Sequence, residues 1–300
     1  MDAYTSKTRD WLNEQFRNVT QDGVYIPHQP IYGFRTEPAP ETRINRYAIT
    51  WQLMKTLAGL SFHSILDVGC AEGYKTAMAR DMFHVQVRGA DLSSEACRRA
   101  REIYGVEADE VDICDLPYRE NSFDLVMCSE VLEHVPEYQQ ALQELFRICA
   151  RAVVITIPLE PEQVARKNRS DQVLHAHIHA FDREGNDFAG CTDNYLVCNR
   201  FHNALTQPLN RLMDGIPRTH PMKFRHRIYN FLAPVTRNLV TGRVAGWLVK
   251  LDGFLANRVG GPRGLTVVLL KDPDCLVEPK IRVTPKQVID YVVPLHRLKP

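Results

Sequence analysis

Carboxylates and glycines stand at a spacing that suits a nucleoside-like ligand. Residues 65–73 read Ile-Leu-Asp-Val-Gly-Cys-Ala-Glu-Gly, so an apolar run ends in an acid and a glycine loop. Gly69 and Gly73 let the backbone bend and let a ligand approach where a Cβ would collide. The spacing differs from the Gly-x-Gly-x-x-Gly of dinucleotide sites, and Asp67 would repel a phosphate. The loop therefore favours a cationic or hydroxyl-rich ligand.

A second carboxylate, Asp91, follows the apolar segment 86–90 and can accept hydrogen bonds from both hydroxyls of a ribose. Hydrogen bonds to a charged acceptor contribute roughly 1.5–3 kcal/mol each. The alternative is that Asp91 caps a helix beginning near Ser93, as aspartate often does. Because the glycine loop precedes it, we favour the ribose interpretation.

Histidines form the other group with chemical potential. His134 follows the apolar run 123–128, and the segment His175-Ala-His177-Ile-His179 follows the run 151–157. If the second segment is extended, its imidazoles alternate onto one face. Histidine can serve as a base or as a hydrogen-bonding wall of a pocket. Three histidines two residues apart rarely converge on one ion and no acidic fourth ligand stands out, so we expect no metal site.

Strand-length and helix-length segments alternate along the chain. This alternation predicts βαβ units and a mostly parallel sheet. The predicted strands are 64–68, 86–90, 106–111, 123–128, 151–157, 194–200 and 264–271. The predicted helices are 8–17, 41–60, 74–82, 93–104, 137–149 and 284–291.

Four segments, in order within residues 64–158, resemble class I S-adenosylmethionine (SAM)-dependent methyltransferases of the type 11 branch. They are Ile65–Gly73, in which Ala71 replaces a glycine, Val87–Ser93, Val111–Asp124 and Met127–Val135. The resemblance implies an α/β, Rossmann-like, mostly parallel seven-stranded sheet with helices on both faces. It also implies an antiparallel last strand beside strand six, with a helical insertion before it.

The resemblance further implies SAM as cofactor, with S-adenosylhomocysteine as product. Asp112 is expected to face the adenine amine, with Ile113 and Leu92 against the two ring faces. The expected cofactor-binding residues are Asp67, Gly69, Cys70, Gly73, Asp91, Leu92, Asp112, Ile113 and Ser129. The expected catalytic candidates near the methyl group and the acceptor are His134, His177 and His179.

The predicted activity is methyl transfer to a small-molecule, glycan or lipid-precursor acceptor, with O-methylation preferred. The Asn/Asp-Pro-Pro-aromatic signature of nucleobase amino-methyltransferases is absent after the fourth strand. One alternative is a protein of the same fold that binds SAM without catalysis. The other is an NAD-dependent oxidoreductase, against which the glycine spacing and Asp67 argue.

Composition indicates an ordinary globular protein. The 300 residues are 44% hydrophobic and 24% charged, and the net charge of +1 gives no reason to expect a nucleic-acid partner. Eight cysteines without a Cys-x-x-Cys pair favour reduced thiols and a cytoplasmic location. The amino terminus has no apolar h-region, which argues against secretion, and no apolar run approaches the length of a membrane span.

We divide the chain into an N-terminal arm or lid (1–40), a SAM-binding core (41–201), an insertion (202–263) and a last strand with tail (264–300). Residues 220–263 carry eight Lys or Arg and one acid, so they predict one or two basic amphipathic helices broken at Pro234. The helices can form a lid over the core, contact an anionic membrane surface at its periphery, or mediate self-association.

Overall fold

The computed structural model describes residues 3–21, 23–31, 43–214, 224–239 and 242–293. The expected boundary between arm and core, at residues 40 and 41, lies outside the described residues. The same is true of the end of the predicted tail, residues 294–300.

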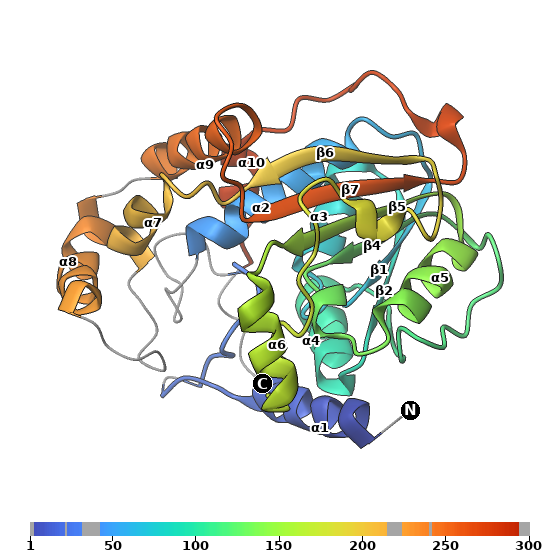
Figure 1. Ribbon diagram of the computed structural model, residues 1–300, viewed down its shortest axis with the longest axis horizontal. Coiled ribbons are helices and arrows are strands. Elements are labelled where there is room, and N and C mark those ends of the chain that lie inside the picture. The colour runs from blue at the N-terminus through green and yellow to red at the C-terminus, as the bar shows by residue number, and fades with distance from the viewer. Residues whose placement is uncertain (1–2, 22, 32–42, 215–223, 240–241, 294–300) are drawn as a thin grey trace.

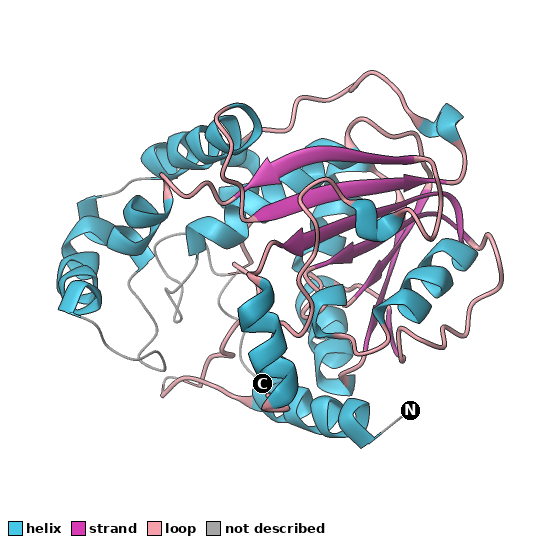
Figure 2. Cartoon of the chain, in the orientation of Figure 1, coloured by secondary structure: helices cyan, strands magenta, loops and turns pink. Residues whose placement is uncertain are grey.

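A single seven-stranded sheet organises the described chain, with helices on both sides (Figure 2). Its strand order is β3-β2-β1-β4-β5-β7-β6; β1 to β5 run parallel, and β7 is antiparallel to both β5 and β6. The strands are β1 (Ser64–Val68), β2 (Gln86–Asp91), β3 (Ala108–Glu110), β4 (Phe123–Ser129), β5 (Cys149–Pro158), β6 (Tyr195–Phe201) and β7 (Gly264–Leu270). The predicted fold class and the antiparallel last strand are confirmed.

Both faces of the sheet are buried because successive side chains of a strand alternate between them. Ile65 of β1 belongs to one apolar cluster, and Leu66 and Val68 to the other. The first cluster contains side chains of α2 (Arg43–Leu57), α3 (Tyr74–Phe83), α4 (Ser94–Tyr104), α9 (Gly242–Arg258) and α10 (Pro285–Ile289). The second contains side chains of α5 (Tyr138–Ile148). The sheet is therefore a rigid platform whose strand ends can hold a site.

The insertion is helical, but its helices are not broken where the sequence suggests. It contains α7 (Gln207–Asp214), α8 (Phe224–Leu239) and α9, and Figure 1 shows α7 and α8 on the far side of the molecule from α5. The prediction that Pro234 breaks the helix is wrong, because α8 runs through it. An interior proline costs about 3 kcal/mol. Contact with α7, including the Thr236 hydroxyl donating to the carbonyl of Leu212, helps to offset that cost.

Two elements near the site differ from expectation. Helix α6 (Glu162–Ser170) follows β5 and was not predicted, because its residues are nearly all polar and only Ala165 is buried. Helix α1 (Ala3–Arg17) is longer than predicted and buries Thr8, Leu12 and Phe16. Helix α1 lines a cavity of the molecule, as does Pro161 immediately before α6.

Among the described residues, no helix combines the length and the apolar character that a bilayer crossing demands. All eight cysteines lie in the described ranges and are free thiols, five of them buried.

Candidate active site

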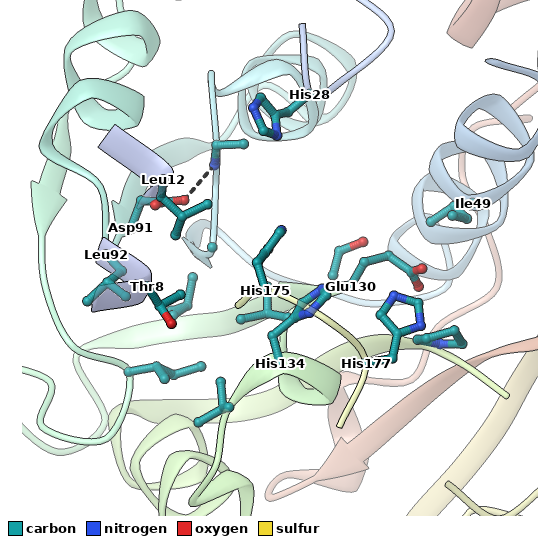
Figure 3. A pocket seen from close by; sticks show the side chains of 18 of the residues that line it. Thr8, Leu12, His28, Ile49, Asp91, Leu92, Glu130, His134, His175 and His177 are labelled. Carbon is teal, nitrogen blue, oxygen red and sulfur yellow. Dashed lines mark hydrogen bonds between the residues drawn. The ribbon is translucent and has the colours of Figure 1, made fainter. Parts of the chain in front are cut away.

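A large cavity opens at the carboxyl ends of the parallel strands. Strand β1 lies between β2 and β4, so the chain connections diverge there and leave the crevice in which open α/β sheets bind ligands. The cavity has a volume of about 1300 Å³, room for a nucleoside cofactor together with a second molecule. Figure 3 shows Leu12, Asp91 and Leu92 at one end, and His134 and His177 toward the other.

The loop after β1 has the conformation that its glycines allow. Gly69 and Gly73 have φ values of 78° and 81°, in the left-handed region. A Cβ at Gly69 would lie 2.2 Å from Cγ2 of Val131. The amides of Gly69 and Cys70 donate to the carbonyl of Ala90, at 2.7 and 3.1 Å. The loop is thereby tied to β2, which carries the second predicted carboxylate.

Asp91 joins the two strand ends. Its Oδ2 accepts the amide of Ala71 at 2.9 Å, and its Oδ1 accepts the amide of Ser93 at 2.9 Å. The cap of α4 is instead Ser93, whose side chain accepts from Ala96. Burial raises the pKa of Asp91 to about 6, although the bonds from Ser93 and Ala71 oppose the shift. A carboxylate has about four acceptor positions, so two remain for a ligand in the cavity that Asp91 lines.

The end of the cavity beside Asp91 suits a flat ring. Leu92, Val111 and Ile113 line it with apolar atoms, and Asp112 lines it with a carboxylate. Asp112 is held by its own loop, because its Oδ1 accepts the amide of Cys114 at 3.0 Å. An acidic acceptor between apolar side chains can bind an aromatic amine.

Helix α1 covers this end. Thr8 and Leu12 line the cavity, and Leu12 and Phe16 pack in a cluster with Ala96 of α4. The hydroxyl of Tyr4 donates to the carbonyl of Val173 at 3.2 Å, so α1 also reaches the segment that follows α6. The helix therefore spans from one end of the cavity toward the other.

Charged side chains are buried beneath the glycine loop. The Lys75 ammonium, on the first turn of α3, donates to the Ser129 hydroxyl at 2.6 Å. Ser129 in turn shares a 2.7 Å hydrogen bond with Thr156. Burial lowers the pKa of Lys75, and the charges of Glu130 and Asp67 oppose that shift. Lys75 therefore supplies the positive charge among several buried acids.

Four of the predicted site residues are absent from the cavity lining. Asp67 is buried and accepts the Thr76 hydroxyl at 2.6 Å; burial raises the pKa of Asp67 to about 6. Cys70 and Gly73 shape the loop from behind. His179 contacts the carbonyl of Val135 through Nε2 at 2.8 Å, and its ring lies beside Tyr138. The structure therefore gives His179 a packing contact in place of the catalytic position expected for it. The predicted residues that do line the cavity are Gly69, Asp91, Leu92, Asp112, Ile113, Ser129, His134 and His177.

The histidines meet because residues 175–179 run alongside residues 133–135. The amide of Ile178 donates to the carbonyl of Glu133 at 2.8 Å, and Nδ1 of His134 lies 3.1 Å from the carbonyl of Ala176. In this register His175 stacks on His134 with ring centroids 4.0 Å apart, and His177 lies 5.0 Å away, edge to face. The segment thus places two imidazoles, and not the predicted three, on the face toward His134.

Two of these rings, His134 and His175, are held in their neutral forms. Burial, together with the neighbouring His175 and His177, lowers the pKa of His134 well below its ordinary value. Burial also lowers the pKa of His175 to about 4. Glu133 is fully buried beside them, and burial with the charge of Glu130 raises the pKa of Glu133 well above its usual range. At neutral pH the stacked imidazoles of His134 and His175 are therefore uncharged.

Sequence reasoning missed several residues of this end. Lys75, Glu130 and Glu133 were not singled out, although all three lie in or next to the quoted motifs. The sequence does contain a signal for Glu133. This acid stands between Leu132 and His134, in a segment of apolar residues directly after a buried strand, where a buried acid is unusual. The backbone of Glu130 has a φ of 59°, a value that residues other than glycine rarely adopt.

Comparison with known proteins agrees with this geometry. Residues 66–157 match the family described as "Methyltransferase domain". Over 159 residues the chain is 28% identical to the methyltransferase GfsG of Streptomyces halstedii, covering 49% of this chain and 55% of that protein. Over 126 residues it is 35% identical to the ubiquinone biosynthesis O-methyltransferase of Ralstonia nicotianae, covering 39% and 49% of the two. The chain thus spans about half the length of these curated relatives.

A solved structure shows the same fold. It is a protein of Galdieria sulphuraria assigned as a sarcosine dimethylglycine methyltransferase, with a TM-score of 0.53 and 16% identity. The likeness covers 90% of this chain and 98% of that one. It therefore includes the insertion side of the molecule as well as the strands around the cavity.

Proposed function

Because this chain is a class I SAM-dependent methyltransferase in family and fold, we propose that it methylates an oxygen of a small-molecule, glycan or lipid-precursor acceptor. The observation that carries the proposal is the cavity itself. One end is lined by Asp91, Leu92, Asp112 and Ile113, and the other by His134, His177 and Glu160. A cofactor site and an acceptor site therefore share one enclosure.

The cofactor is SAM, and the residues at the first end suit it. The two hydrogen-bond-accepting positions of Asp91 that the backbone leaves free match the two hydroxyls of a ribose. The carboxylate of Asp112 matches an exocyclic amine. Gly69, Ala71 and Glu130 line the same cavity. A dinucleotide fits poorly, because a pyrophosphate beside these acids would be repelled.

Methyl transfer from a sulfonium asks a protein mainly for position and for exclusion of water. The oxygen of the acceptor forms a bond to the methyl carbon, while the electron pair of the carbon–sulfur bond remains on sulfur. The acceptor proton must leave to a base or to solvent. We propose that Asp91 and the glycine loop position the cofactor. We propose that α1, in the N-terminal arm, acts as a lid that excludes water.

The acceptor end has a mixed charge that favours a polar ligand. Arg46, Arg183 and Arg263 line it together with Glu160 and the two histidines. The similarity to the O-methyltransferase from Ralstonia supports an oxygen acceptor. His134 and His177 are the side chains that we propose to meet the acceptor hydroxyl.

Calorimetric titration with SAM, S-adenosylhomocysteine and NAD tests the proposal first. We expect the first two to bind with one site per chain and NAD to show no binding. A panel of hydroxyl-bearing acceptors with radiolabelled methyl donor then tests for transfer. Binding of SAM with no transfer to any acceptor would favour the non-catalytic alternative, and binding of NAD in preference to SAM would reject the whole assignment.

The exposed face of α8 and α9 favours a second role, contact with an anionic membrane surface. Phe231 is 80% exposed and Trp247 59% exposed, and Phe224 and Phe254 are also exposed. The basic residues Arg227, Arg243, Lys250 and Arg258 are exposed on the same two helices. Aromatic side chains beside cations are typical of helices that lie in a membrane interface. We propose that a cytoplasmic form of the protein contacts the membrane periphery through this face.

Sedimentation with vesicles tests that role. Vesicles of anionic lipid should retain the protein at low salt and release it as salt screens the charges. The triple variant Arg227→Gln, Arg243→Gln, Lys250→Gln should lose retention, whereas neutral vesicles should not retain the wild type. Equal retention by neutral and anionic vesicles, or none at low salt, would contradict the proposal.

A further inference from the structure

A buried carboxylate at the acceptor end has no hydrogen-bond partner. Glu133 is 0% exposed, and neither Oε1 nor Oε2 finds a donor among the described residues. Its Oε1 lies 3.7 Å from Nε2 of His134, beyond hydrogen-bond distance. Burying such a group without a partner is unfavourable. The Lys75 ammonium acts on Glu133 only as a nearby charge, because it donates to Ser129. A cation in direct contact with Glu133 would supply the missing partner.

Two imidazoles are oriented to share that cation. Nδ1 of His134 lies 3.1 Å from the carbonyl oxygen of Ala176, which can only accept, so Nδ1 carries the proton. Nδ1 of His177 lies 3.0 Å from Oε1 of Glu160 and donates in the same way. Each ring is then left with a lone pair on Nε2. Metal-binding histidines commonly donate their other ring nitrogen to a carbonyl or a carboxylate in this manner.

The three side chains converge. One ligand atom each from Glu133, His134 and His177 lies within 4.8 Å of the others. Metal–nitrogen bonds of about 2.0–2.1 Å in a tetrahedral site place ligand atoms roughly 3.4 Å apart, so separations of up to 4.8 Å must shorten by up to about 1.4 Å. His177 is the member that can close it, because it stands on the loop after α6 with a third of its side chain exposed.

We propose that Glu133, His134 and His177 bind a divalent transition-metal cation of the Zn²⁺ class at the acceptor end of the cavity. Two imidazoles and one carboxylate form the His₂Glu set of catalytic zinc sites, which keep a position open for another oxygen. Hard cations such as Mg²⁺ prefer sites made of oxygen ligands. Glu160 is a positioning residue that fixes the ring of His177.

This site differs from the expectation drawn from sequence. Of the three histidines of the segment, His179 turns toward Val135 and His175 stacks on His134. The ligands come instead from two segments 43 residues apart, His134 and His177, with Glu133 adjacent. Only the tertiary contact brings them together.

The role of the cation rests on the proposed function. His134 and His177 line the cavity, so a cation between them would meet an acceptor hydroxyl there. Cations of this class lower the pKa of a coordinated hydroxyl. The acceptor would then lose its proton to solvent before its oxygen forms the bond to the methyl carbon. This favours acceptors that bear a phenolic or enolic hydroxyl.

Metal titration of the full-length chain, after dialysis against a chelator, tests the site without any assay of activity. We expect one equivalent of Zn²⁺ by calorimetry, and one equivalent of Co²⁺ with a visible spectrum that lacks thiolate charge-transfer bands. Glu133→Gln and His177→Gln should each weaken binding by at least about tenfold, and Glu160→Gln by about 10- to 100-fold. The control His179→Gln removes an imidazole of the same segment and should leave the metal affinity unchanged.

Titration of SAM into the same samples separates the two proposals. Wild-type protein that binds SAM but neither Zn²⁺ nor Co²⁺ at micromolar concentration would overturn the metal site alone. Unchanged metal affinity in His177→Gln, or thiolate bands with Co²⁺, would overturn it too. Metal binding without SAM binding would instead contradict the proposed function. If Glu133→Gln does not fold, His177→Gln decides, because that side chain is partly exposed.

Discussion

The substitution Asp91→Asn tests whether the carboxylate at the tip of β2 holds the ribose. The carboxylate accepts one backbone amide on each oxygen, from Ala71 and Ser93, both at 2.9 Å. Asparagine keeps the shape but has one acceptor oxygen, and its amide nitrogen donates. The side-chain amide of asparagine therefore lies opposite at least one backbone amide or ribose hydroxyl that also donates, and no hydrogen bond forms there.

The expected loss follows from these bonds. One charge-assisted bond to a hydroxyl, worth roughly 1.5–3 kcal/mol, disappears, and the other becomes a neutral bond of about 1 kcal/mol. The sum is about 2–5 kcal/mol, which corresponds to an increase in the Kd for SAM of roughly 30-fold to a few thousandfold. Losing the bond from one backbone amide destabilises the fold, whereas removing a buried charge stabilises it, so we expect a small net change in Tm.

Calorimetry with SAM and with S-adenosylhomocysteine measures the change in affinity. The matched control is Asp109→Asn in the middle of β3, where the carboxylate pairs with Arg88 at 2.5 Å and does not line the cavity. The control should bind SAM as the wild type does. A folded Asp91→Asn protein whose Kd lies within threefold of the wild-type value would refute the assignment of Asp91 to the ribose.

Three further predictions concern pH, the glycine loop and the N-terminal arm. Burial raises the pKa of Asp91 to about 6, and SAM binding requires the ionised form of this carboxylate. Binding titrations across pH should therefore give a SAM affinity that is constant above pH 7 and that falls by up to tenfold per pH unit below pH 6. An affinity that does not change with pH would contradict this. Gly69→Ala combines backbone strain at a left-handed φ with a collision, and should lower the free energy of unfolding by about 2–4 kcal/mol in denaturant melts. Gly105→Ala has the strain without a collision, because nothing lies within 4 Å of its Cβ, and should lower the free energy of unfolding by about 1–2 kcal/mol. Arg99→Leu removes the bonds to the carbonyls of Asn18 and Ile26 and should speed proteolytic cleavage within residues 18–26; an unchanged cleavage rate would show that other contacts hold the arm.

The cofactor end was predictable because its parts are local. A strand, a glycine loop and a helix lie within 20 residues, and each carboxylate stands where its strand ends. The parallel order of β1 and β2 then brings Asp91 to the amide of Ala71. Asp67 shows the limit of this reasoning. The sequence places Asp67 at the end of its strand, but it does not indicate on which side of the loop the side chain lies. It bonds to Thr76 beneath the loop.

The acceptor end was not predictable from local pattern. The position of His177 beside His134 depends on the hydrogen bond between Ile178 and Glu133, two residues that no local rule pairs. Helix α6, which leads into that segment, buries little and so has no apolar periodicity to find. In α8 the opposite occurred: a proline suggested a break, and contact with α7 maintained the helix.

The place of β7 in the sheet has a consequence for how the chain folds. Residues 264–270 fill the gap between β5 and β6, and all seven are buried. Until they emerge from the ribosome, β5 and β6 expose unpaired edges across that gap, and neither apolar layer is complete. Assembly of the sheet must therefore wait until residue 270 has been synthesised, and a nascent chain stalled before residue 264 should depend on chaperones to escape aggregation.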